Sequence, residues 1–223
     1  VEDVAMVLEV ISGHDENDST SGKQVFKTSD CGFRESIRGL KIGLPSEYFV
    51  KGMDKQVEKL VKEAVEKLKE LGAEIVEISL PLTEYAIANY YLIVSAEISA
   101  NMARYDGIRY GLSSVNDANG LDEVYVRSRS EGLGDEVKRR IMLGTYSLSS
   151  GYYDQYYNKA QKVRRLFRNE LAKVFEQVDV IASPTSPTVA FGIGENVKDP
   201  LAMYLADVFT ATASLVGIPA VSV

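Results

Sequence analysis

The sequence has very few of the residues that build disulfides and zinc sites. Among its 223 residues there is one cysteine, Cys31, and one histidine, His14, and there is no tryptophan. A single cysteine excludes an internal disulfide, and this fits a reducing compartment such as the cytoplasm. One cysteine and one histidine cannot supply the ligands of a typical Cys/His zinc site. We therefore expect no metal centre in this chain.

Long apolar runs and an excess of positive charge are also lacking. No apolar segment approaches the roughly 20 residues of a membrane helix, so we expect no membrane partner. The net charge is −7, whereas nucleic-acid-binding modules usually concentrate positive charge. The segment "KAQKVRRLFR" at 159–168 is locally basic, but at helical spacing its cations spread around the helix. Direct nucleic-acid contact there is the less favoured interpretation.

The apolar residues that are present follow strand and helix patterns in turn. "LKIGLP" at 40–45 is typical of a short buried strand. Residues 54–72 have an amphipathic helix pattern, with Asp54 as the N-cap and Gly72 as the terminating residue. "AEIVEISLP" follows at strand spacing. This stretch therefore predicts a βαβ unit with parallel strands.

A second alternation follows a mainly helical region at 84–150. A helix is predicted at 152–177, with inward-facing Val163, Leu166, Phe167, Leu171, Val174 and Phe175. The strand "VDVIASP", a helix at 200–213 and the strand "GIPAVSV" are predicted after it. The expected fold is α/β, with helices packed on a mostly parallel or mixed sheet.

The two ends of the sequence suggest a piece of a longer chain. The sequence begins with Val1 inside an amphipathic helix pattern at 1–12, and it stops within the apolar run 217–223. Native domains seldom end at the last residue of a buried strand. We therefore expect residues 1–223 to form a single, incomplete domain.

The hydroxyl-rich loop "SPTSPT" at 183–188 is the first candidate for chemistry, because it follows a predicted strand. A nucleophilic serine needs a nearby base, but His14 is far away in sequence and no Gly-x-Ser-x-Gly motif is present. The favoured interpretation is a proline-shaped turn, and pocket lining is the alternative. No glycine-rich phosphate loop is present either.

The arginine pair Arg139 and Arg140 is the second candidate. In a helix beginning near Asp135, Arg140 shares its side with Gly144 and Ser147, a small-residue groove that could hold a ligand carboxylate. The alternative is that both arginines are surface residues paired with Asp135 or Glu136. The pattern alone favours the alternative, because most arginines are exposed.

Six segments together resemble a known family. They are "VEDVAMVLEVISGHDENDSTS", "ISANMARYDGIRYG", "EGLGDEVKRRIMLGTYSLSSGYYDQYYNKAQKVR", "VIASPTSPTVAFGIGE", "DPLAMYLADVFT" and "LVGIPAVSV". In this order they resemble the amidase signature family, and within it the A subunits of glutamyl-tRNA(Gln) amidotransferases. The resemblance covers essentially all of residues 1–223.

The resemblance implies a glutaminase. Such a subunit hydrolyses glutamine and passes ammonia to a B subunit, which uses ATP and Mg to convert Glu-tRNA(Gln) to Gln-tRNA(Gln). A small C subunit completes the heterotrimer, and an Asp-tRNA(Asn) reaction is also known for it. The family's Ser–cis-Ser–Lys triad lies in a Gly/Ser-rich signature that is not present in this sequence. We therefore expect no catalytic residue and no cofactor in this chain. The resemblance also implies a cytoplasmic location or, in a eukaryote, an organellar one.

The resemblance also implies three substrate-binding residues. Arg140 in "EVKRRI" corresponds to the family's ligand for the glutamine α-carboxylate, and Asp207 in "MYLAD" corresponds to its ligand for the α-amino group. A tyrosine from the "YY" pair adds a hydroxyl, and Tyr90 is the predicted one, with Tyr91 as the alternative. Two other functions remain open: a fragment of a stand-alone amidase acting on another amide, and a non-catalytic binding module.

Overall fold

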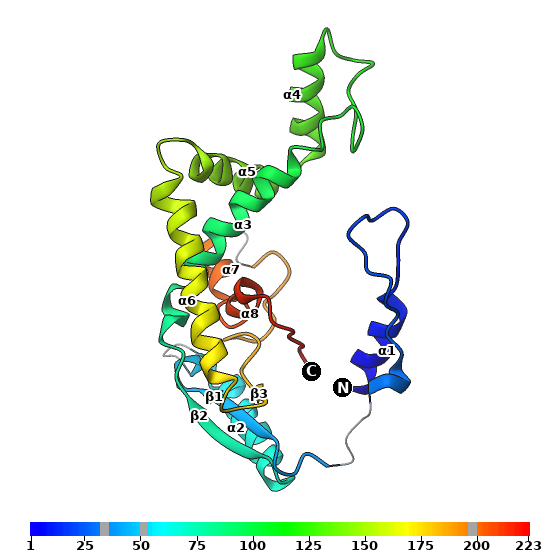
Figure 1. Cartoon of the computed structure of the whole chain (residues 1–223). Coiled ribbons are helices and arrows are strands. Elements are labelled where there is room, and N and C mark those ends of the chain that lie inside the picture. The colour runs from blue at the N-terminus through cyan, green and yellow to red at the C-terminus, as the bar shows by residue number, and fades with distance from the viewer. Residues whose placement is uncertain (32–35, 50–52, 196–199) are drawn as a thin grey trace.

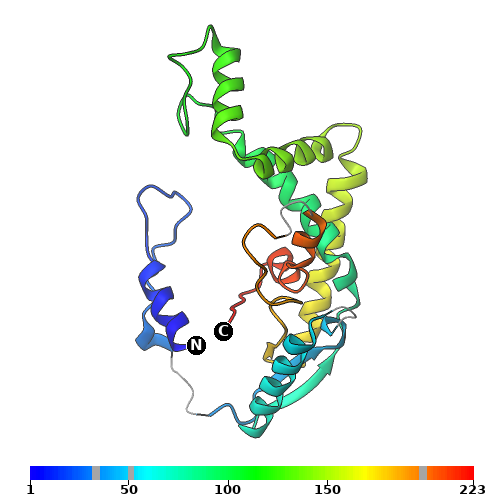
Figure 2. The ribbon, with the colours of Figure 1, turned by 180° about the vertical axis from the view of Figure 1, so that it is seen from behind.

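The computed structural model describes residues 1–31, 36–49, 53–195 and 200–223. A small sheet lies at one end of the molecule and helix α4 (Leu121–Gly132) lies at the other (Figure 1). Between them lie helices α3 (Ala86–Met102), α5 (Asp135–Leu148) and α6 (Lys159–Val174). Helix α1 (Glu2–Ile11) stands apart from this body, and the view from behind shows the same separation (Figure 2). The fold is therefore α/β, with helices and one small sheet.

Within the described residues the sheet has three parallel strands, in the order β2–β1–β3. Strand β1 (Lys41–Pro45) pairs with β2 (Glu74–Ile78) in register from Lys41–Glu74 to Pro45–Ile78. Strand β3 (Val180–Ile181) lies on the other side of β1, with Val180 opposite Ile42. Helix α2 (Lys55–Glu70) connects β1 to β2, so the predicted βαβ unit with parallel pairing is confirmed.

The predicted N-cap and C-terminal glycine of α2 are also confirmed. The Asp54 carboxylate accepts hydrogen bonds from the backbone N–H groups of Gln56 (2.7 Å) and Val57 (3.2 Å), two groups that the helix itself cannot satisfy. At the other end Gly72 has φ +97°, a left-handed conformation that favours glycine directly after a helix.

The main core lies between the sheet and helix α6 (Lys159–Val174), which a short π-helical segment (Asp154–Asn158) precedes. Phe167 is fully buried there and packs in one cluster with Ile78 from β2 and Ile93 from α3. The predicted inward face was wrong for Leu166 and Phe175, whose exposed fractions are 52% and 39%. These side chains lie at the edge of the apolar stripe, and no described neighbour covers them fully.

The middle of the molecule is a close crossing of helices α3 (Ala86–Met102) and α5 (Asp135–Leu148). A Cβ atom added to Gly144 would lie 2.0 Å from the carbonyl oxygen of Ser95, so only glycine permits this approach. The Ser99 and Thr145 hydroxyls hydrogen-bond across the same crossing at 2.9 Å. An irregular segment at 103–120 connects α3 to helix α4 (Leu121–Gly132).

The C-terminal region departs from the predicted pattern. The helix predicted at 200–213 is two short helices, α7 (Pro200–Leu205) and α8 (Ala211–Val216), with a turn between them. The strand predicted at 217–223 was wrong, because this segment is irregular. A strand needs a hydrogen-bonded neighbour, and no strand of the described part pairs with it. Short 3₁₀ turns complete the structure at Thr28–Cys31, Ser46–Tyr48 and Pro81–Tyr85.

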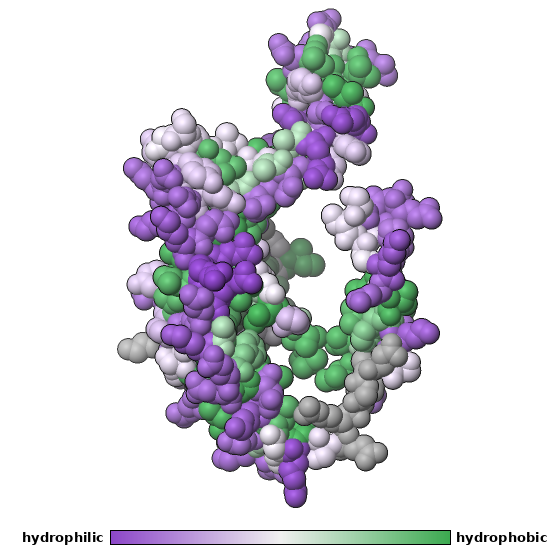
Figure 3. Space-filling model, in the orientation of Figure 1, coloured by the Kyte–Doolittle hydropathy of each residue, from purple (hydrophilic) through white to green (hydrophobic). Residues whose placement is uncertain are grey.

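Apolar side chains remain exposed on α1. Val7, Val10 and Ile11 are exposed by 59%, 84% and 72%, far more than side chains of a packed helix. Figure 3 shows apolar residues on α1 facing the side where the C-terminal segment also lies. No helix among the described residues is long and apolar enough to cross a membrane.

Candidate functional site

The two adjacent arginines of α5 lie in different environments. The side chain of Arg140 is 23% exposed and that of Arg139 is 46% exposed, because neighbouring positions on a helix point about 100° apart. Both pair with Glu136, which lies one turn earlier. Arg140 donates from Nε to Glu136 Oε1 at 2.9 Å, and Arg139 donates from Nη1 to Oε2. The predicted pairing with Glu136 is confirmed, but Arg140 is half-buried.

Two tyrosines from other helices complete the surroundings of Arg140. The guanidinium carbon lies 5.1 Å from the centre of the Tyr91 ring on α3, within the range of a cation–π contact. The Tyr91 ring stacks on that of Tyr204 from α7, with centroids 4.0 Å apart. The Tyr204 hydroxyl donates to Glu136 Oε1 at 3.1 Å. Helices α3, α5 and α7 therefore meet at one polar cluster: Tyr91, Glu136, Arg140 and Tyr204.

The ionisation of these groups is coupled. Burial raises the pKa of Tyr91 to about 12, and the negative charge of Asp207 adds to the rise while Arg140 opposes it. Burial also favours the neutral form of Glu136, but hydrogen bonds from Arg140 and Tyr204 outweigh it and lower the pKa of Glu136. Burial disfavours the Arg140 cation, yet the bond to Glu136 raises the pKa of Arg140 overall. At neutral pH the cluster therefore contains charged Glu136 and Arg140 beside neutral Tyr91.

The structure brings Asp207 to the same cluster. Asp207 follows α7 in the turn before α8, and its charge acts on Tyr91 together with that of Arg140. The side chain is exposed, and its carboxylate makes no hydrogen bond or ion pair with a residue inside the described ranges. The Arg140 cation thus lies against the Tyr91 ring, and the Asp207 anion is near enough for its charge to act on Tyr91, an arrangement suited to a zwitterion.

Tyr90 has a different position from Tyr91. It packs against the buried apolar cluster, and its ring meets Tyr91 edge-on at 5.2 Å. Of the two tyrosines, it is Tyr91 that stacks beside Arg140. Successive helix positions point about 100° apart, so the pair "YY" alone does not show which tyrosine contacts Arg140. The role of a tyrosine hydroxyl in binding stays a prediction.

The small-residue groove predicted beside Arg140 is filled by protein atoms at Gly144 and Ser147. The backbone of Ser95 occupies the space next to Gly144, and Ser147 is buried with its hydroxyl bonded to the Gly144 carbonyl at 3.0 Å. Small residues one turn apart are as typical of a tight helix crossing as of a ligand groove. Glu136 was predicted only as the ion-pair partner of a surface arginine, at the i−4 spacing of a helical pair, and its contact with Tyr204 was not predicted.

The loop at 183–188 behaves as the favoured interpretation expects. Its Pro187 carbonyl accepts a hydrogen bond from the Asp54 backbone, and the Ser186 hydroxyl accepts one from the Thr188 backbone at 3.5 Å. His14 instead bonds Ser21 within the exposed loop after α1, at 2.9 Å. The chain therefore brings no imidazole to these hydroxyls. The described residues also contain no cluster of three or more His, Cys, Asp or Glu that could hold a metal ion.

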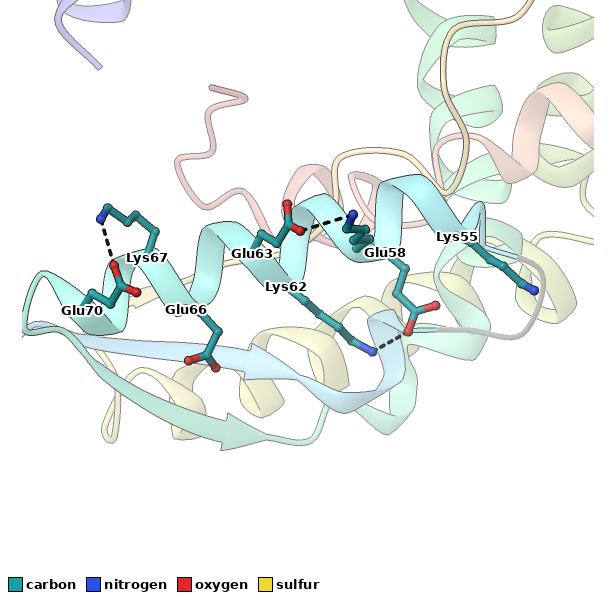
Figure 4. Close-up of a pocket in the computed structure, with 8 residues that line it drawn as sticks. Lys55, Glu58, Lys62, Glu63, Glu66, Lys67 and Glu70 are labelled. Carbon is teal, nitrogen blue, oxygen red and sulfur yellow. Dashed lines mark hydrogen bonds and ion pairs between the residues drawn. The ribbon is translucent and has the colours of Figure 1, made fainter.

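A shallow hollow on α2 is a weaker candidate. Figure 4 shows that its lining residues all project from α2, where Lys62 pairs with Glu58 and Lys67 pairs with Glu70. Such pairs are ordinary for the solvated face of an amphipathic helix. No second element in the described part of the chain lines this hollow, so we place the candidate site at the cluster around Arg140.

Comparison with known proteins decides the family. The amidase family model matches residues 1–223. The chain belongs to the amidase family. It is 57% identical over 225 residues to the A subunit of glutamyl-tRNA(Gln) amidotransferase from Staphylococcus epidermidis and 53% identical to that from Persephonella marina. Each alignment covers 100% of this chain and 46% of the relative, so the chain spans about half the length of these amidase-family relatives.

Solved structures agree with this placement. The chain superposes on the A subunit of glutamyl-tRNA(Gln) amidotransferase from Thermotoga maritima with a TM-score of 0.67 and 38% identity, covering 97% of this chain and 42% of that one. It also matches a bacterial aryl acylamidase of the amidase signature family with a TM-score of 0.63 and 20% identity, covering 100% of this chain and 45% of the other. The second likeness shows the amidase signature fold alone. The predicted fold class and family are both confirmed.

Proposed function

We propose that this chain is part of the glutamine-hydrolysing A subunit of a tRNA-dependent amidotransferase, and that it holds the glutamine. The relatives that are 53–57% identical over the whole chain carry that subunit's name. The observation that carries the proposal is the contact between Arg140 and the Tyr91 ring, on which the charge of Asp207 also acts. Opposite charges at one site suit the α-carboxylate and α-ammonium groups of a free amino acid.

In the proposed complex the site residues of this chain bind glutamine, and none of them performs the chemical step. The Arg140 guanidinium forms two parallel hydrogen bonds to the α-carboxylate. Asp207 accepts from the α-ammonium group, and a tyrosine hydroxyl, from Tyr90 or Tyr91, adds a third contact. Held at both ends of its α-centre, glutamine presents its side-chain amide in one orientation.

The hydrolysis itself belongs to a Ser–cis-Ser–Lys triad, which we assign to the part of the full-length protein outside this chain. The serine attacks the amide carbon and ammonia leaves, and water then hydrolyses the acyl-enzyme ester to glutamate. Ammonia passes to a B subunit, which uses ATP and Mg to amidate the glutamate of Glu-tRNA(Gln), and a C subunit holds the other two together. We place this heterotrimer in the cytoplasm.

The test uses the full-length protein in its heterotrimer. Arg140→Ala is expected to reduce glutamine-dependent transamidation by about 30-fold or more, since losing a charge-assisted pair costs roughly 2–5 kcal/mol. With ammonium chloride as the nitrogen donor, transamidation is expected to stay near the wild-type rate. The neighbouring Arg139→Ala is the control and is expected to lose less than Arg140→Ala. Equal loss with both nitrogen donors would contradict a glutamine-binding role.

A stand-alone amidase acting on another amide is the alternative. Such an enzyme needs no paired charges for an amino acid, so its activity would not depend on both Arg140 and Asp207. Measuring kcat/KM for glutamine and for simple amides with Asp207→Asn separates the two. Selective loss of glutamine hydrolysis supports the amidotransferase function, and equal loss of all substrates supports the alternative.

A further inference from the structure

Glu136 connects three of the groups around the candidate site. Its Oε1 accepts from Arg140 Nε at 2.9 Å and from the Tyr204 hydroxyl at 3.1 Å, while its Oε2 accepts from Arg139. The donors come from two helices, α5 and α7. A surface glutamate in a simple helical ion pair does not receive three donors, so this carboxylate has a more specific arrangement.

We propose that Glu136 is a positioning residue that aims Arg140 at the carboxylate of the bound amino acid. This inference rests on the proposed function. Glu136 takes only the Nε–H of Arg140, and the two Nη groups make no hydrogen bond to any residue in the described ranges. These two groups form the planar fork that grips a carboxylate. The Tyr91 ring against the guanidinium fixes the plane of that fork.

The charges of the cluster agree with this role. Glu136 alone would neutralise Arg140 and compete with a ligand carboxylate. Arg139 pairs with the second oxygen of the same glutamate, so Glu136 and its two arginines together keep one positive charge. That remaining charge attracts an anionic group to the fork of Arg140. Arg139 therefore contributes to the site without contacting the ligand.

Tyr204 extends the arrangement to the amino-group side. Its hydroxyl ties α7 to Glu136, and Asp207 follows three residues later. The bond between Tyr204 and Glu136 thereby sets the spacing between Arg140 and Asp207. A fixed spacing between a cation and an anion selects substrates that carry both α-groups. Glu136 is thus a specificity determinant for α-amino acid amides over amides that lack the carboxylate.

The test compares glutamine with 4-aminobutanamide, which is glutamine without its α-carboxylate. Hydrolysis is measured as kcat/KM in the full-length complex for wild type, Glu136→Ala, Glu136→Gln and Arg140→Ala. Glu123→Ala is the matched control, because Glu123 forms an i,i+4 pair with Arg127 on the remote helix α4. We expect Glu136→Ala to lower the preference for glutamine by about 10- to 100-fold, as removal of supporting hydrogen-bond partners does elsewhere.

Three further outcomes are expected. Glu136→Gln keeps an acceptor for Arg140 Nε and recovers much of the preference, and Glu123→Ala leaves it unchanged. In an Arg140→Ala background, Glu136→Ala lowers the preference no further, because both residues act through one contact. If Glu136→Ala lowers kcat/KM equally for both substrates, its role is only structural and the inference is overturned. If Arg140→Ala itself leaves the preference unchanged, the proposed function fails instead.

Discussion

Gly144 on α5 touches the Ser95 carbonyl of α3 so closely that a Cβ atom at position 144 would lie 2.0 Å from that oxygen. The obstacle is backbone, which cannot rotate away as a side chain can. The crossing of α3 and α5 therefore requires a residue without a Cβ atom at position 144.

Gly144→Ala is expected to destabilise the full-length protein by about 3 kcal/mol or more, at the upper end of overpacking effects. The gain in helix propensity from alanine, about 1 kcal/mol, is too small to offset the clash. The measurement is urea unfolding followed by circular dichroism. Gly151→Ala is the control, because a Cβ there meets no atom within 4 Å. Equal stability of the two variants would contradict the tight crossing.

Two adjacent residues of α6 give a second prediction. Phe167 is fully buried, whereas Leu166 is 52% exposed. Phe167→Ala should cost about 3–5 kcal/mol of unfolding free energy, because it removes a ring and leaves a cavity. Leu166→Ala should cost well under half of that, since most of its surface contacts water already. Thermal unfolding of both variants checks the inward face of α6, and a larger loss at Leu166 would refute it.

The titration of Glu136 gives a third prediction. Burial favours its neutral form, but hydrogen bonds from Arg140 and Tyr204 lower its pKa below the ordinary value of 4.5. A pKa that is lower in the folded state adds stability above the ordinary value, and this contribution is lost as the pH falls through the folded pKa. We expect Arg140→Ala to raise the pKa of Glu136 and Tyr204→Phe to raise it less. Carboxyl ¹³C NMR of the labelled protein measures both shifts. An unchanged pKa in Arg140→Ala would exclude the bond.

The sequence predicted local features well where one segment contains the whole cause. The cap at Asp54, the helix end at Gly72 and the parallel pairing of β1 with β2 all follow from short-range patterns and chain connectivity. The failed strand at 217–223 depends instead on a hydrogen-bonded neighbour, and an apolar pattern cannot supply one.

The candidate site was predictable only in part. Family resemblance selected Arg140 and Asp207, and in the structure Arg140 contacts Tyr91 while the charge of Asp207 acts on the same tyrosine. It could not distinguish Tyr90 from Tyr91, because the choice depends on the rotation of α3 against α5. Tyr204 was missed because its contact with Glu136 joins positions 68 residues apart. Gly144 was misinterpreted because a small residue can make space for either a ligand or a backbone.

The crossing of α3 and α5 fixes the position of Tyr91 relative to Arg140. Tyr91 stands four residues before Ser95, and Arg140 stands four residues before Gly144, so each polar residue lies one turn from the point where the backbones touch. A larger residue at position 144 would push the helices apart and separate the cation from its ring. In a screen that measures only glutamine use, such a variant would be mistaken for a defect in ligand contact. We therefore expect selection to retain Gly144 for substrate choice as much as for stability, although this glycine has no side chain that could contact a ligand.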